Sequence, residues 1–180
     1  MIFKPLSLEG AFEVLLERRI DERGFFSRFY CAEEFSKHGL NITWTQMNLS
    51  LTRGIGSLRG LHFQLGIAAE VKLVRCLRGR VYDVIVDLRE GSNSFGRHVG
   101  VELDAERRNS IYIPKGFAHG FQTLEDEVEL QYFHSEPYSP EHEGGINLMD
   151  PDLAIDWPLP LAQLSERDKN LPTFAEILPL

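Results

Sequence analysis

The stretch KLVRCLRGRVYDVIVDLR, residues 72–89, decides the fold class of this chain. It is rich in Val, Leu and Ile on both sides of Gly79, and β-branched residues favour extended backbone over helix. The stretch therefore predicts two strands joined by a tight turn at Gly79, and we expect these strands to pair as a β-hairpin.

A two-residue period further along the chain predicts a half-buried strand over residues 127–134. One face carries Val128, Leu130, Tyr132 and His134, and the opposite face carries Glu127, Glu129 and Gln131. Because the more apolar face is the one that packs inward, we expect the Tyr132 side chain to point into the protein.

Short strand patterns also occupy residues 98–104 and 109–124, where Gly and Pro punctuate the sequence and no long amphipathic helix intervenes. This spacing is typical of a β-sandwich or β-barrel. Helices are expected only at the edges, at residues 31–39 and at residues 165–170, where Ser165 can serve as an N-cap. A small β-barrel has room for one small ligand, so inward-facing polar side chains are the site candidates.

The composition indicates one domain spanning residues 1–180, because a chain of this length with 43% hydrophobic content suffices for a single core. A net charge of −8 argues against broad attraction to nucleic acid or to an anionic membrane. No apolar run reaches the roughly 20 residues that cross a bilayer. The two cysteines, Cys31 and Cys76, indicate neither a disulfide framework nor a thiolate metal site. We therefore predict a cytoplasmic protein without nucleic-acid or membrane partners.

Two of the six histidines, His62 and His119, lie in short motifs flanked by glycine and aromatic residues, where close backbone approach to a ligand is expected. A catalytic metal centre usually has three or more protein ligands. The residue that shares a strand face with His62 is Gln64, a poor ligand, and no His-x-His pair occurs. A metal site is therefore an alternative that rests on two histidines alone.

Proton transfer next to a ketone is a second interpretation of the same residues. Such a reaction needs a base, a proton donor and a positive group that stabilises the enolate oxygen. His62, Tyr132 and Lys72 could fill these roles in that order. The structural alternatives are a core histidine bonded to a backbone carbonyl, an aromatic core filler and a solvated lysine at a strand end.

A third set of candidate site residues consists of arginines. Arg23, Arg59 and Arg167 could grip a diphosphate, because a guanidinium offers a planar fork of donors and keeps its charge; each could equally form a surface ion pair. Asp168 follows Ser165 by three residues, so it can complete a capping box or hold the ring of a histidine.

The order and spacing of a set of short blocks resemble the dTDP-4-dehydrorhamnose 3,5-epimerase family over residues 12–172. The blocks are DERGFF (21–26), QMN (46–48), LRGLHFQ (58–64), KLVR (72–75), YDVIVDLREGS (82–92), FG (95–96), IPKGFAHGF (113–121), YSP (138–140), GI (145–146), WP (157–158) and LSERD (164–168).

The resemblance implies a cupin-type jelly-roll β-barrel with a few short peripheral helices, which works as a homodimer without a metal or redox cofactor. It also implies epimerisation beside the C4 ketone of a nucleotide-linked 4-keto-6-deoxyhexose. The expected substrate is dTDP-4-dehydro-6-deoxy-D-glucose of the dTDP-L-rhamnose pathway, with both C3 and C5 inverted.

The same resemblance implies roles for individual residues. His62 matches the family's base with Asp168 as its partner, Tyr132 matches the proton donor, and Lys72 matches the cation near the enolate oxygen. Arg23 is expected to reach across the dimer. The substrate-binding positions are Arg23, Phe26, Gln46, Asn48, Arg59, His119, Tyr138, Glu143 and Arg167.

Three positions depart from the family pattern: Arg28 stands where an acidic residue is usual, Met47 where aspartate is usual, and Phe133 where lysine is frequent. These departures motivate an alternative, an epimerase that inverts only C3 or only C5 of another 4-keto sugar nucleotide in antibiotic-sugar or surface-polysaccharide synthesis. A remoter alternative is a metal-dependent cupin enzyme, because PKGFAH (114–119) resembles the second cupin motif. The last is a catalytically inactive, sugar-binding relative.

Overall fold

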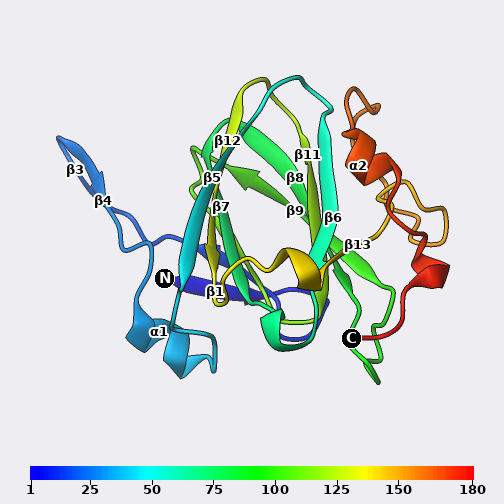
Figure 1. Ribbon diagram of the computed structural model, residues 1–180. Coiled ribbons are helices and arrows are strands. Elements are labelled where there is room, and N and C mark those ends of the chain that lie inside the picture. Colours follow the sequence, from blue (N-terminus) through cyan, green and yellow to red (C-terminus); the bar gives the residue numbers. More distant parts are fainter.

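The computed structural model describes all 180 residues and consists of two antiparallel sheets packed face to face (Figure 1). One sheet has the strand order β1-β2-β10-β7-β12-β5, and the other has the order β13-β6-β11-β8-β9. The strands of the first sheet are β1 (Ile2–Pro5), β2 (Phe12–Leu15), β10 (Ser110–Ile113), β7 (Lys72–Arg78), β12 (Val128–His134) and β5 (Gln46–Thr52). Those of the second are β13 (Glu143–Gly145), β6 (Leu58–Gln64), β11 (Phe117–Thr123), β8 (Arg80–Asp87) and β9 (His98–Asp104).

The helical elements are short and lie at the periphery. They are α1 (Ala32–Lys37), α2 (Glu166–Lys169) and the 3-10 turns η1 (Gly66–Ala68), η2 (Pro140–His142) and η3 (Phe174–Glu176). Both predicted helices are present, and the Ser165 side chain caps α2 by accepting a hydrogen bond from the Asp168 backbone N–H at 3.0 Å. Two packed sheets with only peripheral helices confirm the all-β jelly-roll prediction.

The core lies between the sheets, where the apolar side chains of alternate strand positions meet. Its largest cluster draws on both sheets, with Val128 and Leu130 from β12 packed among Ile85 and Leu103 from β8 and β9. The predicted alternation in residues 127–134 is confirmed, because Tyr132 packs against this cluster. None of the helices in the structure is long and apolar enough to span a membrane.

The predicted hairpin at residues 72–89 is wrong, although both of its strands exist. β7 pairs with β10 and β12, whereas β8 pairs with β9 and β11, so the two strands lie in different sheets. Gly79 lies between them with φ of +74°, a conformation that glycine adopts without strain. The turn therefore carries the chain from one sheet to the other instead of folding it back on itself.

A two-stranded arm, β3 (Arg19–Asp21) and β4 (Gly24–Phe26), extends away from the body of the molecule (Figure 1). The two strands pair only with each other. They expose large apolar side chains, since Ile20 is 78% exposed and Phe26 is 72% exposed. Such exposure is unusual unless another surface covers these side chains.

The core position of Leu103 predicts a measurable loss of stability on truncation. Leu103→Ala removes a fully buried side chain, and we expect the free energy of unfolding to fall by about 2–5 kcal/mol in urea denaturation. The matched control is Leu178→Ala, since Leu178 is 81% exposed, and it should change stability by less than about 0.5 kcal/mol. Equal effects of the two variants would contradict this assignment of the core.

Candidate active site

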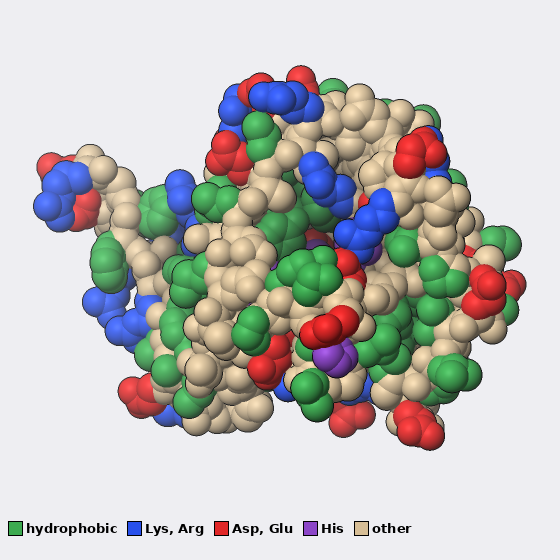
Figure 2. Space-filling view, in the orientation of Figure 1, with side chains coloured by type: hydrophobic (Ala, Val, Ile, Leu, Met, Phe, Trp, Pro, Cys, Tyr) green, Lys and Arg blue, Asp and Glu red, His purple; other side chains and the backbone are tan.

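A cavity of about 1010 Å³ lies between the two sheets and is lined by residues of both, together with residues of α2. Only 9 of its 27 lining residues are hydrophobic, so it suits a polar ligand. Figure 2 shows the hollow from outside, with basic side chains beside its opening. Arg59 and Arg167 are among the lining residues.

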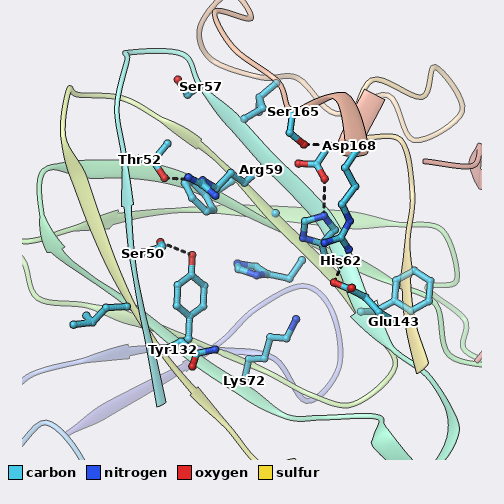
Figure 3. A pocket seen from close by; sticks show the side chains of 18 of the residues that line it. Ser50, Thr52, Ser57, Arg59, His62, Lys72, Tyr132, Glu143, Ser165 and Asp168 are labelled. Carbon is cyan, nitrogen blue, oxygen red and sulfur yellow. Dashed lines mark hydrogen bonds and ion pairs between the residues drawn. The ribbon is translucent and has the colours of Figure 1, made fainter. Parts of the chain in front are cut away.

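His62 and Asp168 form a hydrogen-bonded pair on the side of the cavity formed by β6 and α2 (Figure 3). His62 Nε2 lies 2.8 Å from Asp168 Oδ1, and the Asp168 side chain is only 5% exposed. The aspartate is buried because α2 begins at its Ser165 cap and packs against β6. With Nε2–H donated to the carboxylate, the lone pair of Nδ1 is left free to accept a proton.

The electrostatics of His62 favour the neutral ring. Burial lowers the pKa of His62 below its ordinary value, and this effect exceeds the opposing influence of the Asp168 carboxylate. The positive charges of Arg167 and Lys72 lower the pKa further. His62 is therefore neutral near pH 7, as a base must be.

Tyr132 projects from β12 on the other side of the cavity, where its hydroxyl lies 3.2 Å from Ser50 Oγ (Figure 3). Burial raises the pKa of Tyr132 above its ordinary value, so the phenol keeps its proton. A protonated phenol facing the cavity is a proton donor.

Lys72, at the start of β7, is held by a carboxylate that was not predicted from the sequence. Its Nζ lies 3.3 Å from Glu70 Oε1, and the other carboxylate oxygen, Oε2, accepts a hydrogen bond from His134 Nδ1 at 2.7 Å. Burial alone would raise the pKa of Glu70, but His134 and Lys72 together hold that pKa below its ordinary value. Two sequence features could have indicated this contact. Glu70 lies two residues before Lys72, and His134 lies on the inward face of its strand with Tyr132.

His119 lies opposite His62 in the pairing of β11 with β6, so the two rings share a face of the sheet. Its Nε2 is 2.8 Å from Asp83 Oδ2, and both side chains are buried. Burial raises the pKa of Asp83, and its second oxygen, Oδ1, has no hydrogen-bond partner. Asp83 was also missed; the signal was an acidic residue inside the apolar run of residues 81–86.

The glycines beside these histidines serve strand packing. A Cβ added to Gly60 would lie 2.6 Å from the Gly120 Cα, and one added to Gly120 would lie 2.6 Å from the Arg59 carbonyl oxygen. We expected these glycines to let the backbone approach a ligand. The structure shows that they let β6 and β11 approach each other.

Five predicted binding residues form a connected set, and all of them except Gln46 line the cavity. Arg167 pairs with Glu143 at 2.6 Å, the Tyr138 hydroxyl donates to the same carboxylate at 2.8 Å, and the Tyr138 N–H donates to Gln46 at 3.0 Å. Gln46 in turn donates to Asn48 at 3.2 Å.

Arg59 stands apart from that set, because its Nε donates to the Thr52 hydroxyl at 2.9 Å (Figure 3). Its guanidinium bears no carboxylate partner and is exposed. An exposed guanidinium on a cavity wall is available to an anion.

Arg23 and Phe26 do not join the cavity of their own chain. Both belong to the β3–β4 arm, where the Arg23 side chain is 89% exposed and pairs with Asp21 at 2.7 Å. Phe26 is likewise exposed at the end of β4. The expectation that Arg23 serves a second copy of the chain stays a prediction.

The three residues that depart from the family pattern have different surroundings in the structure. Arg28 pairs with Glu34 of α1 at 2.8 Å, outside the cavity lining. Phe133 is buried on the outer face of its sheet, where its ring packs against Phe29 and Trp44 at centroid distances of 5.3 and 6.1 Å. Met47 alone lies on the cavity lining, with 59% of its surface exposed.

Gln64 has a structural role that accounts for its burial. Its amide nitrogen donates to the carbonyls of Ala68 and Pro137 at 3.1 and 3.2 Å, and its oxygen accepts the Ser139 N–H. No group of three or more His, Cys, Asp and Glu side chains in the structure is arranged to hold a metal ion.

Comparison with known proteins finds similarity along nearly the whole chain. Residues 5–176 match the family model described as dTDP-4-dehydrorhamnose 3,5-epimerase. The dTDP-4-dehydrorhamnose 3,5-epimerase of Methanothermobacter thermautotrophicus is 44% identical over 172 residues, which cover 93% of this chain and 91% of that protein. The dTDP-4-dehydrorhamnose 3-epimerase of Streptomyces niveus is 40% identical over 178 residues, which cover 98% of this chain and 85% of that protein.

Solved structures agree with the sequence comparison. The crystal structure of dTDP-4-dehydrorhamnose 3,5-epimerase from Elizabethkingia anophelis superposes with a TM-score of 0.94 at 42% identity. The superposition covers 98% of this chain and 97% of that one. The similarity therefore extends to the arrangement of both sheets.

The environment of His62 predicts its titration. In NMR spectra the His62 ring should titrate below the ordinary histidine value of about 6.5. Asp168→Asn should move this midpoint to still lower pH, because the carboxylate is the group that raises the pKa. Glu136→Gln, at a position outside the cavity, is the control and should leave the His62 midpoint unchanged. A rise in the His62 midpoint in the variant would contradict the assignment.

Proposed function

Since this chain belongs to the dTDP-4-dehydrorhamnose 3,5-epimerase family, we propose that it inverts C3 and C5 of dTDP-4-dehydro-6-deoxy-D-glucose, giving dTDP-4-dehydro-L-rhamnose. The observation that carries the proposal is the placement of His62 and Tyr132 on facing sides of one cavity, with the Lys72 ammonium pointing in between them (Figure 3). A base and an acid on opposite sides of a substrate carbon are what inversion requires.

His62 is the base that removes the proton from the substrate carbon. The hydrogens on C3 and C5 of the substrate are acidic because the C4 ketone accepts the electron pair of the broken C–H bond, forming an enolate. Neutral His62 takes the proton on Nδ1, and Asp168 stabilises the imidazolium that results. No cofactor is needed for this step, since the ketone is the electron acceptor.

Lys72 and Tyr132 complete each inversion. The Lys72 ammonium stabilises the negative charge that develops on the C4 oxygen. Tyr132 then donates its proton to the carbon from the face opposite His62. The C=C electron pair of the enolate forms the new C–H bond, and a lone pair of the C4 oxygen re-forms the ketone. Proton exchange with water restores neutral His62 and protonated Tyr132.

Arg59 and Arg167 are proposed to bind the diphosphate of the nucleotide sugar. Both line the cavity, and Arg59 faces it without a carboxylate partner. The partner Glu143 of Arg167 is bonded to Tyr138, which fixes an aromatic ring at the same edge. The remaining predicted binders, Gln46, Asn48 and His119, are proposed to fix the orientation of the substrate.

The alternative is inversion at a single carbon, on this or another 4-keto sugar nucleotide. Two observations favour testing it: Met47 lies on the cavity lining in place of the usual aspartate, and one relative is named as a 3-epimerase. Inversion at one carbon and inversion at two carbons both require His62, Tyr132, Lys72 and Asp168. The presence of these residues therefore does not distinguish the two hypotheses.

Exchange of substrate hydrogens with solvent distinguishes inversion at two carbons from inversion at one. In deuterated water with dTDP-4-dehydro-6-deoxy-D-glucose, we expect NMR spectra to show deuterium at both C3 and C5, because each carbon is reprotonated from a solvent-derived proton. Deuterium at C3 alone would replace the proposal by the single-centre alternative. No exchange with this or any other 4-keto sugar nucleotide would refute the epimerase proposal altogether.

Two controls accompany the exchange experiment. His62→Asn should slow exchange by roughly 10²- to 10⁴-fold while dTDP still binds, because only the base is lost. Elemental analysis tests the metal-dependent alternative, which would require stoichiometric bound iron, zinc or manganese that is lost in a His62→Ala variant.

We also propose that residues 1–180 act as one domain that assembles as a homodimer, with each arm carrying Arg23 and Phe26 to the cavity of the other copy. Two surfaces support this. β5 is an edge strand whose alternate residues Met47, Leu49 and Leu51 lie at the rim of the cavity and are 59%, 69% and 40% exposed, and the arm exposes Phe26. A second copy would bury both apolar surfaces at once.

Light scattering tests the assembly. The native protein should have about twice the chain mass of 20.6 kDa, and Leu49→Glu should shift it toward the monomer, because a charge would be buried at the interface. The matched control is Leu178→Glu, at a position 81% exposed on the C-terminal segment, which should leave the mass unchanged. A monomeric native protein would refute the dimer.

The cytoplasm is the proposed location. Both cysteines are free, and Cys76 is buried with its pKa raised by burial to about 12, so it is an inert thiol. A chain without disulfides is typical of a reducing compartment.

A further inference from the structure

Glu70 and His134, which have no part in the reaction steps above, form a buried cluster with Lys72 inside the cavity. The Glu70 side chain is 7% exposed, His134 is 13% exposed and Lys72 is 10% exposed. Both carboxylate oxygens are occupied, one by the Lys72 ammonium at 3.3 Å and the other by the His134 ring at 2.7 Å. The carboxylate is therefore fixed from two directions.

His134 is held on both ring nitrogens. Nδ1 donates to Glu70, and Nε2 faces the Asn48 side-chain amide at 3.4 Å. The ring also stacks on Tyr132, with centroids 6.0 Å apart and planes 19° from parallel. One rigid histidine thus connects the carboxylate that holds Lys72 with the ring of the proton donor.

The strand register explains why these groups meet. His134 is directly opposite Lys72 in the pairing of β12 with β7, so the two side chains share a face, and Tyr132 is on the same face two residues earlier. Glu70 lies just before β7, where the chain enters the sheet. Four side chains from two strands and one loop therefore converge at one corner of the cavity.

Lys72 needs such an anchor for two reasons. An ammonium on four flexible methylenes has many rotamers, and a useful charge must be near the reacting oxygen before the reaction starts. Burying an ammonium without a partner also costs free energy, because the charge loses its hydration. Glu70 meets both requirements, since it contributes a negative charge and has a fixed orientation.

We propose that Glu70, oriented by His134, is a positioning residue of the reaction, which holds the Lys72 ammonium where the enolate oxygen forms. The inference rests on the proposed epimerase function, because it assigns Glu70 a task only if Lys72 stabilises an enolate. Glu70 does not touch the reacting atoms and acts through Lys72.

The experiment compares Glu70→Gln with Glu136→Gln. Glu136 forms an ion pair with Lys115 at 3.1 Å, close to the Lys72–Glu70 distance, but on the exposed surface and outside the cavity. We expect Glu70→Gln to lower kcat by about 10- to 100-fold with KM changed less than about threefold, because the ammonium is misplaced while the nucleotide contacts remain. Glu136→Gln should leave both constants at the native values.

A double-mutant cycle shows whether Glu70 acts through Lys72. Deuterium incorporation is followed for days at high enzyme concentration in Lys72→Met and in the double variant, so that slow rates are measured. In the Lys72→Met background, Glu70→Gln should change the rate by less than about twofold, since the group it positions is already absent. A merely structural role would lower the rate by a similar factor in both backgrounds.

Three results would overturn the inference while leaving the epimerase proposal intact: native kcat in Glu70→Gln, an equal loss in Glu136→Gln, or an undiminished effect of Glu70→Gln beside Lys72→Met. Absence of exchange by the native protein is a different result, because it removes the proposed function itself.

Discussion

The two-residue period of extended backbone is the constraint on which every part of this site depends. On β5 the residues Gln46, Asn48, Ser50 and Thr52 make side-chain hydrogen bonds at the cavity, while Met47, Leu49 and Leu51 between them leave apolar side chains exposed at its rim. The same period brings Tyr132 and His134 inward on β12. Because opposite residues of paired strands share a face, the polar side chains of neighbouring strands accumulate in one place.

Burial then sets the chemistry of these polar groups. A charge removed from water is stable only beside a partner, and the cavity supplies partners in pairs: Asp168 with His62, Glu70 with Lys72. Burial also lowers the pKa of His62 and raises that of Tyr132, so the ring is neutral and the phenol is protonated at the same pH. A neutral base and a protonated acid can therefore be present on opposite sides of one cavity at the same pH.

Much of this could be predicted from the sequence, because strand periodicity and short motifs are local. The inward direction of Tyr132, the Ser165 cap of α2 and the all-β class follow from neighbouring residues alone. The hairpin prediction at Gly79 failed because a glycine turn specifies only where one strand ends and the next begins, whereas the partner of each strand is chosen by residues far away in the chain. Asp83 and Glu70 were missed for the same reason, since nothing local distinguishes an acidic residue that meets a distant histidine from one that faces water.

The sequence by itself determined which residue types occur and on which face of each strand they lie, and its blocks were specific enough to indicate the family. Only the tertiary structure decided which faces meet. It placed Asp168 against His62 across 106 residues of chain, turned Gly60 and Gly120 into a contact between two strands, and kept Arg23 and Phe26 away from their own cavity. The physical reason is that hydrogen bonds and burial act between atoms close in space, and sheet pairing makes distant residues neighbours.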